Sequence, residues 1–279
     1  MKREIVISTT VTKSFYKQFL LLKFSAEQYH ECKWVVSCDD VVYDYLREFD
    51  NAHAILNIEH EGNHMTGTAA EMENFTDVVL TKFASCEYSI KKYGYGFFLD
   101  SDIFFTNPLS DDFFSFLKDP AIEMINTPHY NDDPWTIQKS GFFNVGMFAV
   151  KNLEILNDWK VLTENHRDLN IFYEQKPQEF LSRERYSLSL PINYNIGSWR
   201  FTGYYNSSKI RFINLKDDVL YFGNYPAINF HVHTLRDLKN GNGDQFLYEK
   251  VFSILKKSNN KKYIEFMKFY DKLRVREEH

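Results

Sequence analysis

The sequence contains no apolar run that approaches the roughly 20 residues of a membrane-spanning helix. Its first residues lead directly into Ile5-Val6-Ile7 and lack the apolar core of a signal peptide. Its formal net charge of −5 excludes the basic excess that is usual in general nucleic-acid-binding proteins. We therefore expect a cytoplasmic protein that binds no nucleic acid and whose anionic ligands are small.

Cysteine is also scarce. The three cysteines, Cys32, Cys38 and Cys86, are an odd number without the spacing of a metal site, so free thiols in a reducing compartment are the simplest explanation. Aromatic residues, by contrast, are abundant, with 26 Phe and 18 Tyr. We expect most of them to fill the core, although exposed rings also serve as platforms for sugars. A chain of 279 residues can bury roughly three quarters of its unfolded surface, which predicts one large domain or two closely packed lobes.

The first hundred residues alternate between strand and helix patterns. Short apolar segments predict strands at residues 5–8, 33–37, 54–56 and 95–99. The helices between them are expected to be capped by Ser14, by Asp39 or Asp40, and, at the end of a helix over 75–93, by Gly94. Residues 57–74 lack periodicity and predict a long surface loop. Repeated strand-helix-strand units predict an α/β fold with a mostly parallel sheet, whose ligands bind beyond the carboxyl ends of the strands.

The second half is more mixed. We expect strands at residues 142–150, 187–190, 210–213 and 227–233, a helix at 153–166, and two Lys-rich helices between 250 and 279. No internal repeat or low-complexity segment is present.

Asp100 and Asp102 lie directly after the apolar segment Phe97-Phe98-Leu99 and are separated by one small residue. At a strand end, where the backbone bends, both carboxylates can converge on one cation. Such oxygen ligands suit Mn²⁺ or Mg²⁺, which usually keep positions open for substrate phosphates. Surface turns also produce Asp-x-Asp, but the apolar strand before the pair favours a functional site.

The segment Phe98-Leu99-Asp100-Ser101-Asp102-Ile103, followed by Asn107-Pro108-Leu109, resembles the metal-binding signature of GT-A fold nucleotide-sugar glycosyltransferases. It is similar in particular to the group that includes glycogenin and the bacterial lipopolysaccharide galactosyltransferases. The resemblance implies a GT-A (Rossmann-like) fold and transfer of a hexosyl group from a nucleotide-diphosphate donor, most often UDP, to a hydroxyl of a glycan or glycolipid. It also implies that Asp102 holds the metal, that Asp100 bridges metal and donor, and that Ser101 lies beside the donor.

Further residues match the same family pattern. Lys82 lies 18 residues before Asp100, where the family places a basic residue near the donor. Phe143-Asn144-Val145-Gly146 is similar to a strand whose Asn contacts the donor sugar, so the resemblance assigns Asn144 and Gly146 to donor binding; a strand-edge turn is the alternative for Asn144. Thr9 and Thr10 match the position that recognises the nucleotide base, and a helix-capping turn there is compatible with that role.

Glu174-Gln175 resembles an Asp-Gln pair that the family places beside the reacting sugar carbon. The resemblance therefore implies catalytic roles for Glu174 and Gln175, although a surface helix start is the alternative, and Glu replaces the usual Asp. Glu174 can serve as a general base in an inverting enzyme or orient groups in a retaining one.

His231 and His233 lie on one face of the strand predicted at 227–233. Two such histidines are often structural, but the family supplies a late His as its third metal ligand. The resemblance therefore assigns His231 to the metal and His233 to the donor phosphates. The Gly, Lys, Pro and Trp that follow this His in the family are absent here.

The resemblance covers about residues 1–240. We expect a catalytic domain at 1–245, with a donor-binding half at about 1–110 and an acceptor-side half at about 111–245, followed by a helical extension at 246–279. The extension carries Lys256, Lys257, Lys261 and Lys262, which predict a solvated helix face. Basic amphipathic helices also dock on anionic membranes, so peripheral membrane contact is an alternative.

Two other functions fit part of the pattern. A haloacid dehalogenase-type phosphatase also uses Asp-x-Asp after an apolar strand, with the first Asp as nucleophile. That fold normally opens with the motif, whereas here about a hundred residues precede it. The other alternative is a protein that binds a sugar or nucleotide without turning it over.

Overall fold

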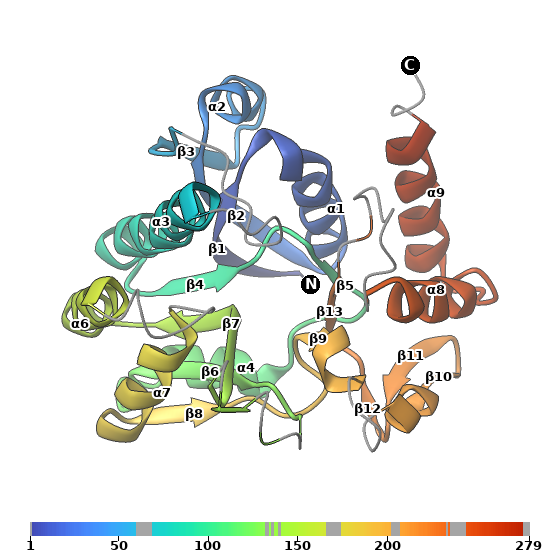
Figure 1. The fold of residues 1–279 in the computed structure, drawn as a ribbon. Coiled ribbons are helices and arrows are strands. Elements are labelled where there is room, and N and C mark those ends of the chain that lie inside the picture. Colours follow the sequence, from blue (N-terminus) through green and yellow to red (C-terminus); the bar gives the residue numbers. More distant parts are fainter. Residues whose placement is uncertain are drawn as a thin grey trace.

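A seven-stranded mixed sheet lies at the centre of the fold (Figure 1). The computed structural model describes residues 2–59, 69–131, 134, 137–138, 141–165, 174–201, 207–232, 234 and 244–275. The strands of the sheet are, in spatial order, β3 (Ala52–Leu56), β2 (His30–Cys38), β1 (Arg3–Val11), β4 (Gly96–Leu99), β7 (Phe143–Val150), β6 (Met124–Pro128) and β8 (Ser187–Ser189). Only β7 runs antiparallel to its neighbours β4 and β6, while the other pairs are parallel. The predicted α/β fold with a mostly parallel sheet is confirmed.

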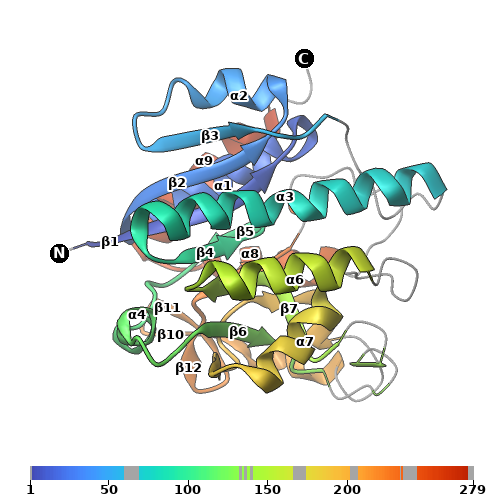
Figure 2. The same cartoon turned by 90° about the vertical axis from the view of Figure 1, so that its left-hand side faces the viewer.

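Helices cover both faces of this sheet. One face packs against α1 (Tyr16–Glu27), α2 (Asp40–Leu46) and α4 (Asp111–Lys118), through a core that includes Ile7, Phe19 and Phe113. The other face packs against α3 (Ala69–Tyr93), α6 (Leu153–Asn165) and α7 (Gln175–Glu184), and Figure 2 shows α3 and α6 side by side on it. The strands read as continuous apolar runs because they are buried from both sides.

Two small sheets lie beyond the central one. The first consists of β5 (Ile103–Phe105), β13 (Asn229–His231) and β9 (Ile196–Gly197), with β13 in the middle. The second is an antiparallel sheet of β10 (Ile213–Lys216), β11 (Val219–Phe222) and β12 (Tyr225–Pro226). The first of these sheets positions the candidate site, because it connects the end of β4 to the late segment around His231.

The two C-terminal helices, α8 (Asp244–Leu255) and α9 (Lys261–Val275), confirm the predicted helical tail. They share a core with the small sheets, in which the Phe104 ring lies 5.6 Å from Phe252 and 5.1 Å from Phe266. In addition, Phe269 stacks on Phe24 of α1 at 4.3 Å. The division into domains at residue 245 stays a prediction, although the tail is packed against the body of the molecule.

Several local predictions differ from the structure. The N-cap position of α1 is Phe15 rather than Ser14, because a short 3-10 helix, η1 (Lys13–Phe15), precedes α1. Of the two candidates at α2, Asp39 is the cap, and its Oδ1 accepts a hydrogen bond from Val42 N at 2.8 Å. Gly94 ends α3 with φ of 85°, as predicted.

The boundaries of two other segments also differ. Residues 69–74, predicted as loop, are the first turns of α3, while residues 60–68 of that loop lie outside the described residues. The strand predicted at 210–213 is largely a 3-10 helix, η4 (Ser207–Phe212); another, η3 (Ser198–Phe201), precedes it.

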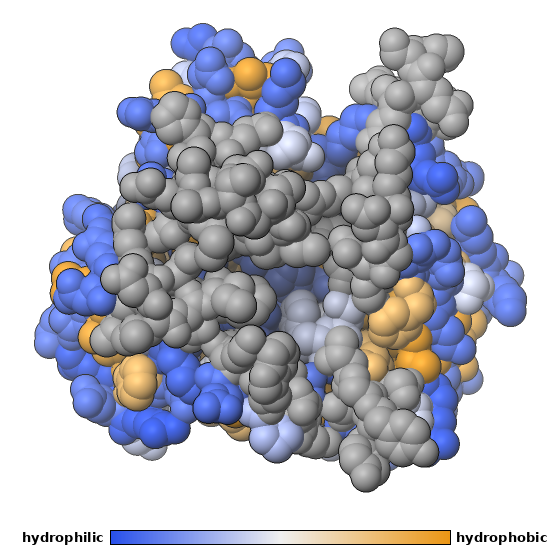
Figure 3. Space-filling view, in the orientation of Figure 1, coloured by the Kyte–Doolittle hydropathy of each residue, from blue (hydrophilic) through white to orange (hydrophobic). Residues whose placement is uncertain are grey.

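None of the helices that the structure describes combines the length and apolar character that crossing a bilayer requires. On the face drawn in Figure 3, hydrophilic residues dominate, apolar ones form small separate areas, and the surface is hollowed near its centre.

Candidate metal and donor site

The Asp-x-Asp segment lies where β4 ends, between β1 and β7 in the middle of the sheet. Asp100 N donates to Gly146 O of β7 at 2.8 Å, and Ile103 N donates back to Asp100 O at 3.2 Å. The chain therefore turns sharply after β4 and leaves the central sheet along β5. The turn places both carboxylates at the carboxyl end of the parallel strands, where ligands of such sheets bind.

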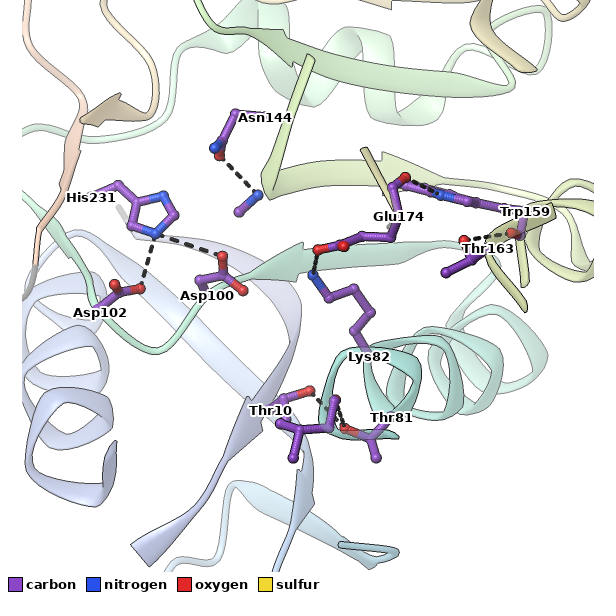
Figure 4. A network of polar contacts seen from close by, with 12 residues as sticks. Thr10, Thr81, Lys82, Asp100, Asp102, Asn144, Trp159, Thr163, Glu174 and His231 are labelled. Atoms are coloured by element: carbon purple, nitrogen blue, oxygen red, sulfur yellow. Dashed lines mark hydrogen bonds and ion pairs between the residues drawn. The ribbon is translucent and has the colours of Figure 1, made fainter. Parts of the chain in front are cut away.

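His231 reaches the same point from a distant part of the sequence. It lies on β13, where it pairs with Ile103, and Val232 N donates to Asp102 O at 3.1 Å. Its Nε2 is 3.1 Å from Asp102 Oδ1 and 3.6 Å from Asp100 Oδ2, and Figure 4 draws both contacts as dashed lines. In the part of the chain that the structure describes, this is the one group of three acidic, His or Cys residues with ligand atoms within 4.8 Å of one another.

The chemistry of these three side chains fits a divalent cation. Two carboxylates and one imidazole supply three ligand atoms, which leaves coordination positions for other oxygens. Asp102 is 7% exposed, so its negative charge lies in a poorly solvated place. Burial raises the pKa of the Asp100 carboxyl, against the opposite effects of Lys82 and His231. A cation offsets the negative charge that this arrangement concentrates, which is the reason such clusters bind metals.

Gly146 is explained by the close packing of Asp100 and His231 against β7. A Cβ atom at this position would lie 2.2 Å from His231 Cε1 and 2.8 Å from Asp100 Oδ2. Only glycine therefore lets β7 approach both side chains. Asn144 supports the same strand, because its Oδ1 accepts from Gly146 N at 2.9 Å and from Asn195 Nδ2 at 2.7 Å. Asn144 and Gly146, which were predicted to bind the donor, therefore also shape the cluster of Asp100, Asp102 and His231.

A buried ion pair lies next to this cluster. Lys82 Nζ of α3 is 3.0 Å from Glu174 Oε1, and the two side chains are 5% and 7% exposed (Figure 4). Burial alone lowers the pKa of Lys82, but Glu174 and Asp100 outweigh it and the pKa is raised. Lys82 therefore stays charged between a carboxylate of the ion pair and a carboxylate of the metal cluster. Trp159 Nε1 donates to Glu174 O at 2.7 Å and fixes the segment before α7.

Two buried acceptor atoms beside this ion pair lack a hydrogen-bond donor within the described part of the chain. Glu174 Oε2 and Gln175 Oε1 are buried and have no hydrogen-bond partner among the described residues. Buried polar atoms are usually satisfied, so such exceptions often mark places where another molecule binds. Glu174 and Gln175 lie at the start of α7, as the alternative of a surface helix start predicts, but both side chains are about 5% exposed, so they do not lie on the surface.

The remaining predicted residues differ in their surroundings. The Thr9 side chain is fully buried, and its Oγ1 has no partner among the described residues. Thr10 points to the other face, where its Oγ1 lies 3.3 Å from that of Thr81, one residue before Lys82. Ser101 is 6% exposed within the turn, and His233 lies outside the described residues.

Two residues near the site were not predicted. Asn195 Oδ1 lies 3.1 Å from His231 Nδ1, and the Trp199 ring meets the His231 ring edge-on at 5.0 Å. Both come from the irregular segment after β8, which has no periodicity, so the sequence offers no signal for them. Their position depends on the pairing of β9 with β13.

No protein-family model matches this chain, and no curated protein matches its sequence significantly. Solved structures do match. Mouse xyloside xylosyltransferase 1 has 12% identity and a TM-score of 0.52, covering 83% of this chain and 98% of that one. The glycosyltransferase GlyE of Streptococcus pneumoniae has 15% identity and a TM-score of 0.53, covering 98% of this chain and 64% of that one.

WbbM, a bifunctional glycosyltransferase, has 11% identity and a TM-score of 0.50, covering 96% of this chain and 52% of that one. The chain thus spans less than two thirds of GlyE and WbbM. At these identities the likeness shows the fold, and the predicted GT-A-like fold is confirmed.

Proposed function

We propose that this chain is a metal-dependent glycosyltransferase that moves a hexosyl group from a nucleotide-diphosphate donor, UDP in the first instance, to a hydroxyl of a glycan or glycolipid. The observation that carries the proposal is the convergence of Asp100, Asp102 and His231 at the carboxyl end of the central strands. The fold, shared with known glycosyltransferases, supports it.

Asp100 Oδ2, Asp102 Oδ1 and His231 Nε2 are the atoms that would hold Mn²⁺ or Mg²⁺. Such a cation, when bound, offsets the charge of a diphosphate and stabilises it as a leaving group. Lys82 supports the same task, because its ammonium is buried, stays charged and lies within electrostatic reach of Asp100. Thr10 lies on the same face of the sheet as Lys82 and is the better candidate of the two threonines for a donor contact.

We assign Glu174 to the reacting sugar. Lys82 holds its Oε1, whereas Oε2 has no partner among the described residues and is available to a substrate hydroxyl. A carboxylate in this position can accept the proton of an acceptor hydroxyl or orient the donor sugar. The anomer of the first product, read by proton NMR, separates an inverting from a retaining reaction.

The phosphatase alternative has less support. It requires Asp100 as a nucleophile, but the Asp100 carboxylate supplies one of three ligand atoms that converge on a single point. Asp100 also follows the fourth strand of a glycosyltransferase-like sheet. A binding protein without turnover keeps the same residues, so only an activity measurement separates it from an enzyme.

The direct experiment has two parts. A thermal-shift panel of UDP, GDP, CDP and dTDP, each with Mn²⁺ or EDTA, identifies the nucleotide, since a ligand at a hundredfold excess over its Kd adds about 2.7 kcal/mol of stability. UDP-glucose, UDP-galactose and UDP-xylose are then compared for release of UDP with Mn²⁺.

We expect a Mn²⁺-dependent shift with one nucleotide and faster release from a hexosyl donor than from the pentosyl donor. Asp102→Asn should lose both signals, whereas Asp44→Asn, which removes an exposed carboxylate, should keep them. No shift with any nucleotide and no turnover would refute the proposal.

A cytoplasmic location, with contact to a membrane only through charge, is part of the same proposal. Most apolar positions of the C-terminal helices are used in the core, and only Phe246 and Ile264 are exposed large apolar side chains among the described residues of these helices, at 39% and 40%. The exposed cations of that segment, among its described residues, are Lys256, Lys257, Lys261, Lys268, Lys272 and Arg274. Sedimentation with anionic vesicles that disappears at high salt supports this view, and binding to neutral vesicles contradicts it.

A further inference from the structure

The second ring nitrogen of His231 has a specific partner. Nε2 faces the carboxylates of Asp100 and Asp102, whereas Nδ1 lies 3.1 Å from Asn195 Oδ1. Asn195 itself is 1% exposed and comes from a segment remote in sequence from both carboxylates. The tautomer of a metal-binding histidine is set by the hydrogen bond of its other nitrogen.

The orientation of the Asn195 amide follows from the hydrogen bonds around it. Gly146 N, a backbone donor, points at Asn144 Oδ1 at 2.9 Å, so this atom of Asn144 is an oxygen. The Asn195 atom 2.7 Å from it must then be the donor nitrogen, which also lies 3.0 Å from Thr127 Oγ1. The other amide atom of Asn195, the one beside His231, is therefore the oxygen, and only a protonated Nδ1 can donate to it.

The backbone of Asn195 is held as firmly as its side chain. Asn195 N donates to Asn229 Oδ1 at 2.6 Å, and Arg200 Nη2 donates to Asn195 O at 2.9 Å. Its φ of 50° lies in the left-handed region, which asparagine tolerates better than most residues. Asn229 adjoins Phe230 and His231 on β13, so the support and the ligand move together.

We propose that Asn195 is a positioning residue of the metal site, which holds His231 in the Nδ1–H tautomer and so presents Nε2 to the cation. This inference rests on the proposed metal site and on no particular donor or acceptor. Loss of such a supporting hydrogen bond typically lowers metal affinity by about 10–100-fold.

The test uses the full chain and two measurements that do not depend on activity. In protein labelled with ¹⁵N-histidine and loaded with diamagnetic Mg²⁺, long-range proton–nitrogen spectra report the tautomer of His231, assigned with His231→Gln. Electron paramagnetic resonance of free Mn²⁺ gives the Kd of the wild type and of each variant.

Asn195→Gly tolerates the positive φ and removes the three side-chain hydrogen bonds, to Asn144, Thr127 and His231. We expect it to lose the Nδ1–H preference and to bind Mn²⁺ about 10–100-fold more weakly. Asn195→Asp keeps an acceptor for His231 and the same backbone tolerance, and should retain the tautomer and more of the affinity than Asn195→Gly. As a matched control, Asn51→Ala removes a half-buried amide that donates to Glu27 Oε1 and Cys32 O, and should leave the Kd for Mn²⁺ unchanged.

Three outcomes overturn the proposal. They are an Nε2–H tautomer in the Mg²⁺-loaded wild type, an unchanged Kd in Asn195→Gly, and a loss in Asn51→Ala as large as that in Asn195→Gly. If the wild type binds Mn²⁺ and releases UDP while Asn195→Gly is unchanged, only the role of Asn195 fails. If the wild type binds no Mn²⁺, the metal site fails with it, and metal-dependent transfer is refuted.

Discussion

The candidate site has two neighbouring parts that handle charge in opposite ways. Around His231, two carboxylates of the same sign converge, so the cluster is suited to a cation from outside. Between α3 and α7, Lys82 and Glu174 neutralise each other within 3.0 Å. The cluster of Asp100, Asp102 and His231 therefore needs a bound cation to balance its charge, whereas the Lys82–Glu174 pair is neutral without a ligand. Changes in the two parts should therefore affect binding and stability differently.

The largest effect is expected from Lys82→Met. The substitution leaves the Glu174 carboxylate buried without its partner, which costs about 3–5 kcal/mol of unfolding free energy. Urea unfolding measures the loss, and the double variant Lys82→Met/Glu174→Gln should recover most of it. A loss below about 1 kcal/mol in the single variant would contradict a buried, charged pair.

Asp102→Asn should instead affect function and spare the fold. It removes one ligand atom, and we expect turnover of the donor to fall by about 10²–10³-fold, as for other groups that stabilise developing charge. Urea unfolding in EDTA should stay close to that of the wild type. A stability loss as large as that of Lys82→Met would remove the distinction between the two parts.

Gly146→Ala tests how closely β7 must approach the cluster. The new Cβ would lie 2.2 Å from His231 Cε1, so we expect a loss of about 1–3 kcal/mol together with weaker Mn²⁺ binding. Gly94→Asn is the control, because a side chain there meets nothing within 4 Å and asparagine tolerates its positive φ. Equal Mn²⁺ binding in Gly146→Ala and wild type would contradict the packing explanation.

His30 gives a pH effect that is independent of the site. Burial lowers its pKa from 6.5 to about 4, and its Nε2 accepts a hydrogen bond from Leu109 N. Between pH 4 and 6.5, His30 is therefore protonated in the unfolded chain but neutral in the folded chain. The contribution is complete above pH 6.5 and is lost as pH falls toward 4, by up to about 1.4 kcal/mol per pH unit.

His30→Gln keeps an acceptor for Leu109 and should flatten the pH dependence of urea unfolding between pH 6.5 and 4, with EDTA present throughout. The Asp102→Asn variant should keep the wild-type slope attributable to His30. An unchanged slope in His30→Gln would show that this histidine is not the acid-sensitive group.

Much of the donor side could be predicted from local sequence. Gly94 specifies the end of α3 through its backbone preference. The apolar segment before Asp100 specifies β4 through its pattern alone. The C-terminal helices were predicted for the same reason. The loop at 57–74 was predicted less well, since residues 69–74 look irregular in sequence but belong to α3. The segment at 210–213 looks extended in sequence, but most of it belongs to the helix η4.

Local sequence by itself determined the strand that presents Asp100 and Asp102, because burial on two faces demands an apolar run and a turn must follow it. Only the tertiary structure decided that His231 joins them, that Gly146 makes room for all three, and that Asn195 holds the histidine ring. Those contacts join residues up to about 130 positions apart, through strand pairing between β5, β9 and β13. Pairing of distant strands depends on the packing of the whole core, and no short stretch of sequence contains it.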